Sequence, residues 1–324
     1  MNILFAGNQV QDFLYHGQAF EQTAAGTYDP NWVPNCIEHN DNDVGLRCPV
    51  FADQTDVWIH WNDRQSGTYT DWPMWYAYNG AGTAKLRLRD STTGARTFVL
   101  EWHNGSTWVS LGSVTDAFSL NTLTQHDVHV KIDGASSELA WYINKVQVVK
   151  AIGDFSSIVG IAQANWLAAR NNTHTTRISE VIIADESTIS LRYKLILPET
   201  NGTHNDFTGD VADVDEVQLN NNDFIYATTA NLLETFKAAA RDFSGFTIKT
   251  VSISIYGLRG QDGPQNVQPV FRIGGADYLG TILPLDWGFA PVREYFPLNP
   301  ATGISWTPTD AGDADLEFGL KSIA

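Results

Sequence analysis

The sequence predicts an all-β protein made of two sandwich domains, residues 1–194 and 195–324. Apolar residues recur with a period of two wherever they gather, which is the spacing of a half-buried strand. The period of 3.6 expected for amphipathic helices hardly occurs. Gly, Asn and Asp turns separate these runs at intervals of about 8–15 residues, which is typical of a β-sandwich or jelly roll.

The first domain opens its strand pattern at residues 56–61, where Val57, Ile59 and Trp61 share one face. Residues 84–90 turn two leucines inward and three basic residues outward: Leu86 and Leu88 against Lys85, Arg87 and Arg89. Residues 97–112 form two alternating runs around Asn104-Gly105, a dipeptide that favours a tight hairpin. The same pattern predicts strands in 126–134, 138–150 and 176–187.

The second domain repeats the pattern in residues 247–258, 268–275 and 315–323. A cluster of Pro, Gly and Asn near Pro198 predicts the boundary between the domains. One helix is expected over residues 229–243, because Leu232, Leu233, Phe236 and Ala240 could form one face and the alanines have high helix propensity.

Length and composition are sufficient for two packed domains, since the chain has 324 residues, of which 43% are apolar. Its 20 basic and 37 acidic residues give a net charge of −17, which repels nucleic acid and anionic membranes, so we expect no nucleic-acid or membrane partner. No apolar stretch approaches the length of a transmembrane helix. The first residues, MNILFAGNQVQDF, lack the basic residues of a signal peptide, which predicts a soluble product made in a cytoplasm.

The two cysteines, Cys36 and Cys48, lie twelve residues apart. This separation permits a disulfide loop in an oxidising compartment. With so few cysteines, we favour two small, part-buried thiols.

The run HDVHVKIDGASSELAWYINKVQVVK, residues 126–150, resembles part of a concanavalin A-like (laminin G-type) jelly roll. An alternating strand, a turn at Asp133-Gly134 and a strand bearing WYINKVQV carry the resemblance. It covers about half of the first domain and implies that residues 1–194 form a jelly roll of this type, with this strand pair on the concave sheet.

A second resemblance covers residues 178–227 and later pieces of the chain. A strand, a turn of the form Pro-x-x-x-Gly at Pro198 and an acidic stretch resemble a pattern in structural proteins of tailed bacteriophages. This resemblance implies a virion component, such as a fibre, an adornment or a capsid decoration, made in the host cytoplasm and assembled with other capsid or tail proteins. It implies a homo-oligomer, since trimers are common in fibre-like proteins, and it supplies no catalytic residues.

Two acidic segments are candidates for calcium binding. Residues 205–217 contain Asp213 and Asp215, which would share one side of an extended chain, but the spacing does not match an EF-hand. Asp41 and Asp43 alternate in a second segment, HNDNDVG. Both segments are also typical of solvated turns, so we expect no obligatory cofactor and leave calcium as an alternative.

The sequence does not predict an enzyme. The carboxylates most suitable for glycoside hydrolysis are Asp313, Asp315 and Glu317, which would share one face of a strand. They lie at the C-terminal end, outside the predicted jelly roll, and no aromatic cleft surrounds them in the sequence. The nucleophile, zinc and phosphate-loop motifs of the common hydrolases and nucleotide-binding enzymes are absent from the sequence.

An aromatic segment, TYTDWPMWYAYNG, provides the most distinctive binding candidates. Its aromatic residues are Tyr69, Trp72, Trp75, Tyr76 and Tyr78. They could fill the core between two sheets, contact a neighbouring protein subunit, or stack on the apolar faces of sugars.

These observations favour a bacteriophage virion structural protein that acts through protein–protein assembly. The alternative is a carbohydrate-binding module that recognises a glycan on the host surface.

Overall fold

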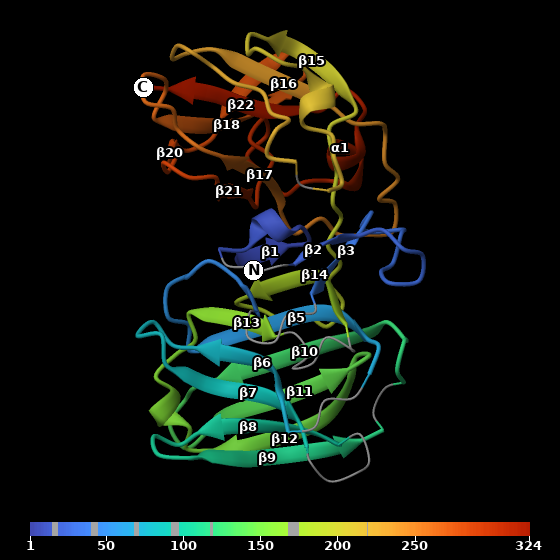
Figure 1. Cartoon of the computed structure of the whole chain (residues 1–324), viewed down its shortest axis with the longest axis vertical. Coiled ribbons are helices and arrows are strands. Elements are labelled where there is room, and N and C mark those ends of the chain that lie inside the picture. The colour runs from blue at the N-terminus through green and yellow to red at the C-terminus, as the bar shows by residue number, and fades with distance from the viewer. Residues whose placement is uncertain are drawn as a thin grey trace. The chain divides into compact units, whose positions relative to one another are not determined.

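The computed structural model of the chain describes residues 1–14, 19–39, 45–67, 71–91, 97–116, 119–167, 175–218 and 220–324. The chain divides into two compact units, Met1–Leu195 and Ile196–Ala324, each built from antiparallel strands (Figure 1). The predicted all-β fold class, with antiparallel sheets in a larger first unit and a smaller second unit, is confirmed. The concanavalin A-like type of the first unit stays a prediction of the sequence resemblance. Over these ranges, no helix is long and apolar enough to cross a membrane.

The first sheet of unit 1 has the strand order β12-β11-β10-β5-β14-β3-β2, and β1 also pairs with β14. Its strands are β1 (Ile3–Gly7), β2 (Phe20–Gln22), β3 (Cys36–His39), β5 (Asp56–Gln65), β10 (Thr124–Lys131), β11 (Ser137–Ile143), β12 (Val146–Gly153) and β14 (Thr176–Ala184).

The second sheet of unit 1 has the order β4-β13-β6-β7-β8-β9, and Figure 1 shows β6, β7, β8 and β9 side by side. Its strands are β4 (Gly45–Arg47), β6 (Pro73–Tyr78), β7 (Ala84–Asp90), β8 (Thr97–His103), β9 (Trp108–Thr115) and β13 (Gln163–Leu167). Single 3-10 turns at Val10–Asp12 and Ser156–Ile158 complete the unit. The predicted hairpin at Asn104-Gly105 joins β8 to β9, and Gly105 there has a φ of 103°.

The core of unit 1 lies between the two sheets and is dominated by indole rings. Trp61 of β5 stacks on Trp75 of β6 at 5.6 Å between ring centroids. His126 lies in the same layer, stacked between Trp61 and Trp141 at 5.0 and 5.9 Å, and accepts a hydrogen bond from Trp141 Nε1. Since the predicted inward residues Val57, Ile59, Leu86 and Leu88 are all fully buried, the alternation found in the sequence does point these side chains into the core.

Unit 2 contains a six-stranded sheet of order β15-β16-β22-β18-β19, with β20 paired to β18, and a separate pair formed by β17 and β21. Its elements are β15 (Thr200–Asn205), the 3-10 turn Val211–Asp213, β16 (Leu233–Lys237), β17 (Val251–Gly257), β18 (Asn266–Ile273), β19 (Ala276–Leu279), β20 (Leu283–Pro284), β21 (Ala290–Phe296), α1 (Pro308–Gly312) and β22 (Glu317–Ile323). Phe271 of β18 meets Phe296 of β21 edge to face at 4.9 Å, so a small core joins the two sheets.

The predicted helix over residues 229–243 is wrong. Its centre forms strand β16, which pairs with β15 on one side and β22 on the other. Phe236 then lies opposite Phe318 of β22 and is 4% exposed, while the side chain of Thr235 donates to Glu317. Pairing on both edges thus outweighed the helix propensity of this segment, and the only α-helix over the described ranges is the short α1.

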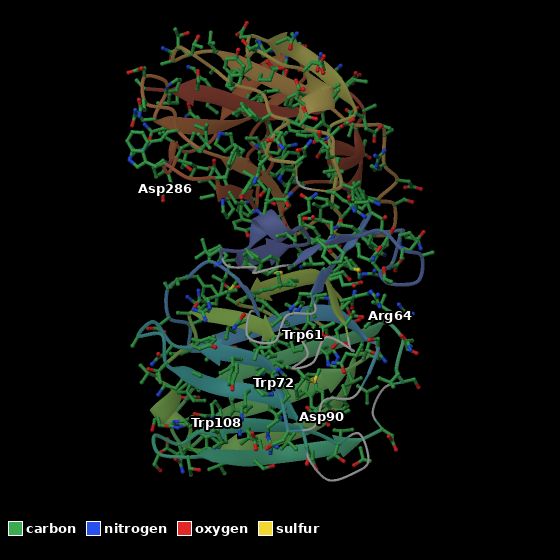
Figure 2. The ribbon with its side chains drawn as sticks, viewed as in Figure 1. Trp61, Arg64, Trp72, Asp90, Trp108 and Asp286 are labelled. Atoms are coloured by element: carbon green, nitrogen blue, oxygen red, sulfur yellow. The ribbon has the colours of Figure 1, made fainter. Side chains whose placement is uncertain are left out.

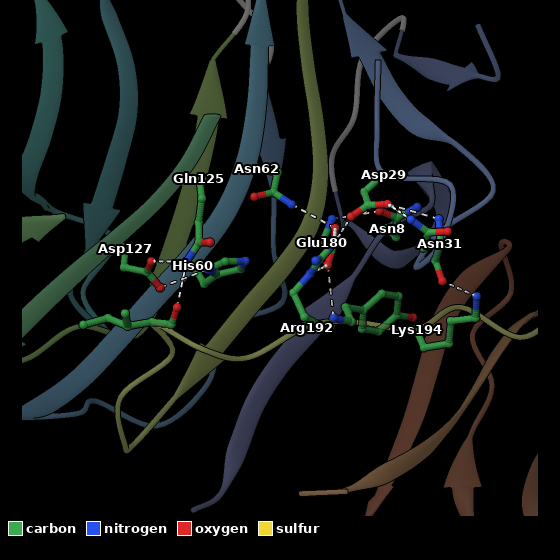
Figure 3. A network of polar contacts seen from close by, with 12 residues as sticks. Asn8, Asp29, Asn31, His60, Asn62, Gln125, Asp127, Glu180, Arg192 and Lys194 are labelled. Carbon is green, nitrogen blue, oxygen red and sulfur yellow. Dashed lines mark hydrogen bonds and ion pairs between the residues drawn. The ribbon is translucent and has the colours of Figure 1, made fainter. Parts of the chain in front are cut away.

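A buried carboxylate fastens the end of unit 1 to its first sheet (Figure 3). Glu180 of β14 is fully buried and has a φ of 52°, a left-handed backbone conformation that is strained for a glutamate. Its carboxylate accepts hydrogen bonds from Asn62 and Arg192, and its backbone N–H donates to Asn8. Because Arg192 also pairs with Asp29, residues 186–195 are held against the sheet before the chain leaves the unit.

Cys36 and Cys48 are both free thiols and both buried, so the favoured interpretation of two separate thiols is confirmed. Burial raises the pKa of the Cys36 thiol to about 11 and that of the Cys48 thiol to about 12.

We predict that Arg192→Ala lowers the free energy of unfolding of unit 1 by about 3 kcal/mol, because it leaves the Glu180 carboxylate buried without its cation. The matched control is Lys150→Ala, which removes the partner of the more exposed Glu138 and should cost less than about 1 kcal/mol. Urea unfolding followed by tryptophan fluorescence measures both. Equal losses in the two variants would contradict the role of the buried pair, and adding Glu180→Gln to Arg192→Ala should recover part of the loss.

We also predict that neither thiol of the native protein reacts with a thiol reagent at pH 8, because both are buried and protonated. After unfolding without a reductant, two thiols should react. Rapid reaction of the native protein, or no reaction after unfolding, would contradict this description.

Candidate functional site

The outer face of the second sheet carries one row of side chains that crosses all six strands in register. Arg47 of β4 lies opposite Asn165 of β13, which lies opposite Tyr76 of β6. The row continues to Arg87 of β7, Glu101 of β8 and Ser110 of β9. Since side chains alternate along each strand, this row is the outward counterpart of the tryptophan and leucine residues that fill the core.

Glu101 is the centre of an ion cluster on this face. Its carboxylate accepts hydrogen bonds from Arg87 Nε and from Arg89 Nε and Nη2, at 2.5, 3.2 and 2.9 Å, and Arg89 also pairs with Asp71. Burial of Glu101 would raise its pKa, but the two guanidinium groups outweigh burial and lower it below the ordinary value. Glu101 is therefore an ionised acceptor held in a fixed position, with only 5% of its surface exposed.

Three aromatic side chains lie beside this cluster. Trp108, at the start of β9 (Figure 2), lies under the Arg87 guanidinium, whose carbon is 4.3 Å from the ring centroid, and meets His103 edge-on. Its ring centroid is 5.9 Å from that of Tyr76, which in turn is 5.9 Å from that of Tyr78. Burial raises the pKa of Tyr76 against the opposing effect of Arg87, so this phenol stays protonated as a donor.

Asn165 has a buried acceptor in the middle of the row that no described residue satisfies. Among the residues that the structure describes, its side-chain oxygen has no hydrogen-bond partner, and the residue is 4% exposed. Gly45 provides the space for this amide, because a Cβ there would lie 2.1 Å from the Asn165 oxygen. A buried acceptor without a donor is costly in a folded protein, so its presence on this face points to a ligand or water that supplies the donor.

The structure divides the aromatic segment of the sequence between two environments. Trp75 is fully buried in the core and Trp72 packs against that core, whereas Tyr76 and Tyr78 lie on the outer face. Tyr69 lies outside the described residues.

The acidic candidates do not form a site in the part of the chain that the structure describes. Asp213 accepts a hydrogen bond from the backbone N–H of Asp210 and so caps a 3-10 turn. Burial raises the pKa of the Glu216 carboxyl group, and the neighbouring acidic groups of Asp223 and Asp215 raise it further. No group of three or more acidic, His or Cys side chains in the described ranges is arranged for a metal ion, and Asp41 and Asp43 fall outside those ranges.

The three C-terminal carboxylates do not share one strand face, contrary to expectation. Only Glu317 lies in β22, where it is buried and accepts hydrogen bonds from Thr203 and Thr235. Asp313 ends helix α1, and the exposed Asp315 pairs with Lys237. Strand β22 begins only at Glu317, so the alternation of side chains along a strand does not place Asp313 and Asp315 on the same face as Glu317.

Most residues of the row on the second sheet were not predicted from the sequence to belong to one site. Arg87 and Arg89 were predicted to point outward, but Arg47, Glu101, Trp108 and Asn165 were not connected with them. The outward positions of the predicted 97–112 hairpin were a signal from which part of this row could have been predicted. What the sequence does not give is the register between strands as distant as β4, β13 and β6.

Comparisons with known proteins identify no family. No protein-family model matches the chain, and no curated protein matches it. Solved structures with a similar course of the chain include a sialidase, at 8% identity and a TM-score of 0.35, covering 62% of this chain but only 22% of the sialidase. A galectin of Caenorhabditis elegans matches at 10% identity and a TM-score of 0.32 over 45% of this chain and 95% of its own.

A third structure, the receptor-binding domain of botulinum neurotoxin type G, covers 95% of this chain and 99% of its own, at 8% identity and a TM-score of 0.37. Such remote likenesses carry no argument about the activity of this chain. Its function has to be inferred from the residues on its own second sheet.

Proposed function

We propose that this protein binds carbohydrate on the outer face of its second sheet. The observation that carries the proposal is the row of Arg47, Asn165, Tyr76, Arg87 and Glu101, flanked by the rings of Trp108 and Tyr78. Sugars combine apolar ring faces with dense hydroxyl groups. A surface that sets aromatic rings beside fixed donors and acceptors matches both properties.

The ion cluster gives this face its hydrogen-bonding groups before any ligand arrives. Glu101 accepts from two arginines that hold it in place, so a sugar hydroxyl can donate to a carboxylate that needs no reorganisation. The guanidinium groups offer N–H donors to the ring and hydroxyl oxygens of the sugar. Trp108, fixed against Arg87 and His103, provides a rigid aromatic surface with little conformational entropy to lose.

A role as a virion component stays a prediction of the sequence resemblance. Assembly with capsid or tail proteins, formation of trimers and location in a virion are compatible with a carbohydrate-binding face.

We predict that the protein binds a subset of glycans on an array and that Trp108→Ala weakens this binding at least about tenfold, or about 1.4 kcal/mol. The matched control is Trp58→Ala, which removes another half-buried indole, stacked on His129 in the first sheet, and should leave binding unchanged. Absence of binding to every glycan, or equal losses in both variants, would contradict the proposal. Thermal melts confirm that each variant is folded.

Binding should also depend on the ionised state of Glu101. Because the arginines lower its pKa below the ordinary 4.5, we expect affinity to stay level from pH 7 to about 5 and to fall only below 4.5. The titration uses a His103→Gln background, since this imidazole contacts Trp108. A Glu101→Gln variant should bind weakly at every pH, and an unchanged affinity in that variant would show that the carboxylate is not used.

A further inference from the structure

The candidate site has two chemically different ends. Resting on the proposed function, we infer that it takes an oligosaccharide rather than a single sugar, with an anionic unit, carrying a carboxylate or sulfate, at the Arg47 end.

Contacts between neighbouring side chains connect the two ends of the site. From Trp108 the path leads to Tyr76, then to Tyr78, and from there to the Arg47 guanidinium, in steps of 5.9, 5.9 and 5.4 Å. These residues lie on β9, β6 and β4, and neighbouring strands are separated by about 4.8 Å. A single sugar ring is comparable in size to one aromatic ring, so it can cover one of these steps but not all three.

The Trp108 end is already neutralised by its own residues. Arg87 and Arg89 share the Glu101 carboxylate, and Arg89 has a second acidic partner in Asp71. Two cations thus face two anions at this end. Because its charges are balanced, this cluster suits hydrogen bonds with uncharged hydroxyl groups of a ligand better than an ion pair with a charged group.

The Arg47 end carries a charge that the described side chains do not balance. Arg47 is exposed, and it belongs to none of the arginine ion pairs formed within the described ranges, although the chain as a whole has a net charge of −17. On this face its neighbours are uncharged: the guanidinium lies over the ring of Tyr78, and the backbone pairs with Asn165.

This arrangement suits an anionic group on the ligand. A guanidinium presents paired N–H donors that match a carboxylate or sulfate, and Tyr78 fixes its plane. Asn165, next to Arg47 in the row, has the unpartnered buried oxygen described above, which a hydroxyl of the same sugar unit could satisfy. A charged group and an unmet acceptor therefore mark the same end of the site.

The experiment starts from a glycan that binds the protein on the array. It compares neutral and sulfated forms of this oligosaccharide, in lengths of about two to six units. Affinities of the full chain, Arg47→Ala, Arg47→Lys and the control Arg64→Ala are measured calorimetrically at two salt concentrations. Arg64 lies on β5 of the first sheet and donates to the backbone of Asn121, so its loss leaves the candidate site intact.

We expect the longer sulfated forms to bind the full chain about tenfold more tightly than the neutral forms, with a preference that weakens at high salt. Arg47→Ala should abolish this preference, Arg47→Lys should retain part of it, and Arg64→Ala should retain all of it. Equal affinity for neutral and sulfated forms, with Trp108→Ala still abolishing binding, would overturn this inference and leave the proposed function standing. Failure of every form to bind would instead overturn the proposed function, and the inference with it.

Discussion

The register of the six-stranded second sheet of unit 1 is the constraint on which the rest of this protein depends. A shift of one residue in any strand would move its inward side chains to the solvent and its outward side chains into the core. Leu86 and Leu88 are inward and fully buried, while Arg87 between them is outward and reaches Glu101 on the next strand. The same alternation therefore builds the hydrophobic core and the polar row, so the candidate site needs no element beyond those that stabilise the fold.

Burial on the outer face gives the site its chemical character. A carboxylate as buried as Glu101 would be costly alone, and the two arginines offset that cost with charge-assisted hydrogen bonds. Each of these groups restricts the others, and Arg87 also fixes Trp108. The face is thus rigid before a ligand arrives, whereas Asn165 and Arg47 at its other end keep hydrogen-bonding and charge capacity that the described side chains do not use.

The sequence predicted the features that depend on local spacing. Alternation identified β5, β7 and the β8–β9 hairpin, and it placed Arg87 and Arg89 outward. It could not predict that Arg47, Asn165 and Tyr76 would be neighbours, because their strands are far apart in the chain and only the folded sheet sets their register. The helix expected over residues 229–243 failed for a related reason, since pairing of β16 with β15 and β22 is a non-local interaction that local propensity does not contain. The buried and the outward aromatic residues of the aromatic segment could be told apart only from the structure, because only the folded sheet shows which side of β6 faces the core.

The most direct test of the account is to follow the indole N–H resonances of the eleven tryptophans by NMR during titration with a glycan that binds. Binding on the outer face of the second sheet predicts that the Trp108 resonance moves progressively, while those of the core residues Trp61 and Trp141 stay in place. A titration that shifts Trp58 on the first sheet or Trp287 in unit 2, and leaves Trp108 unchanged, would contradict it.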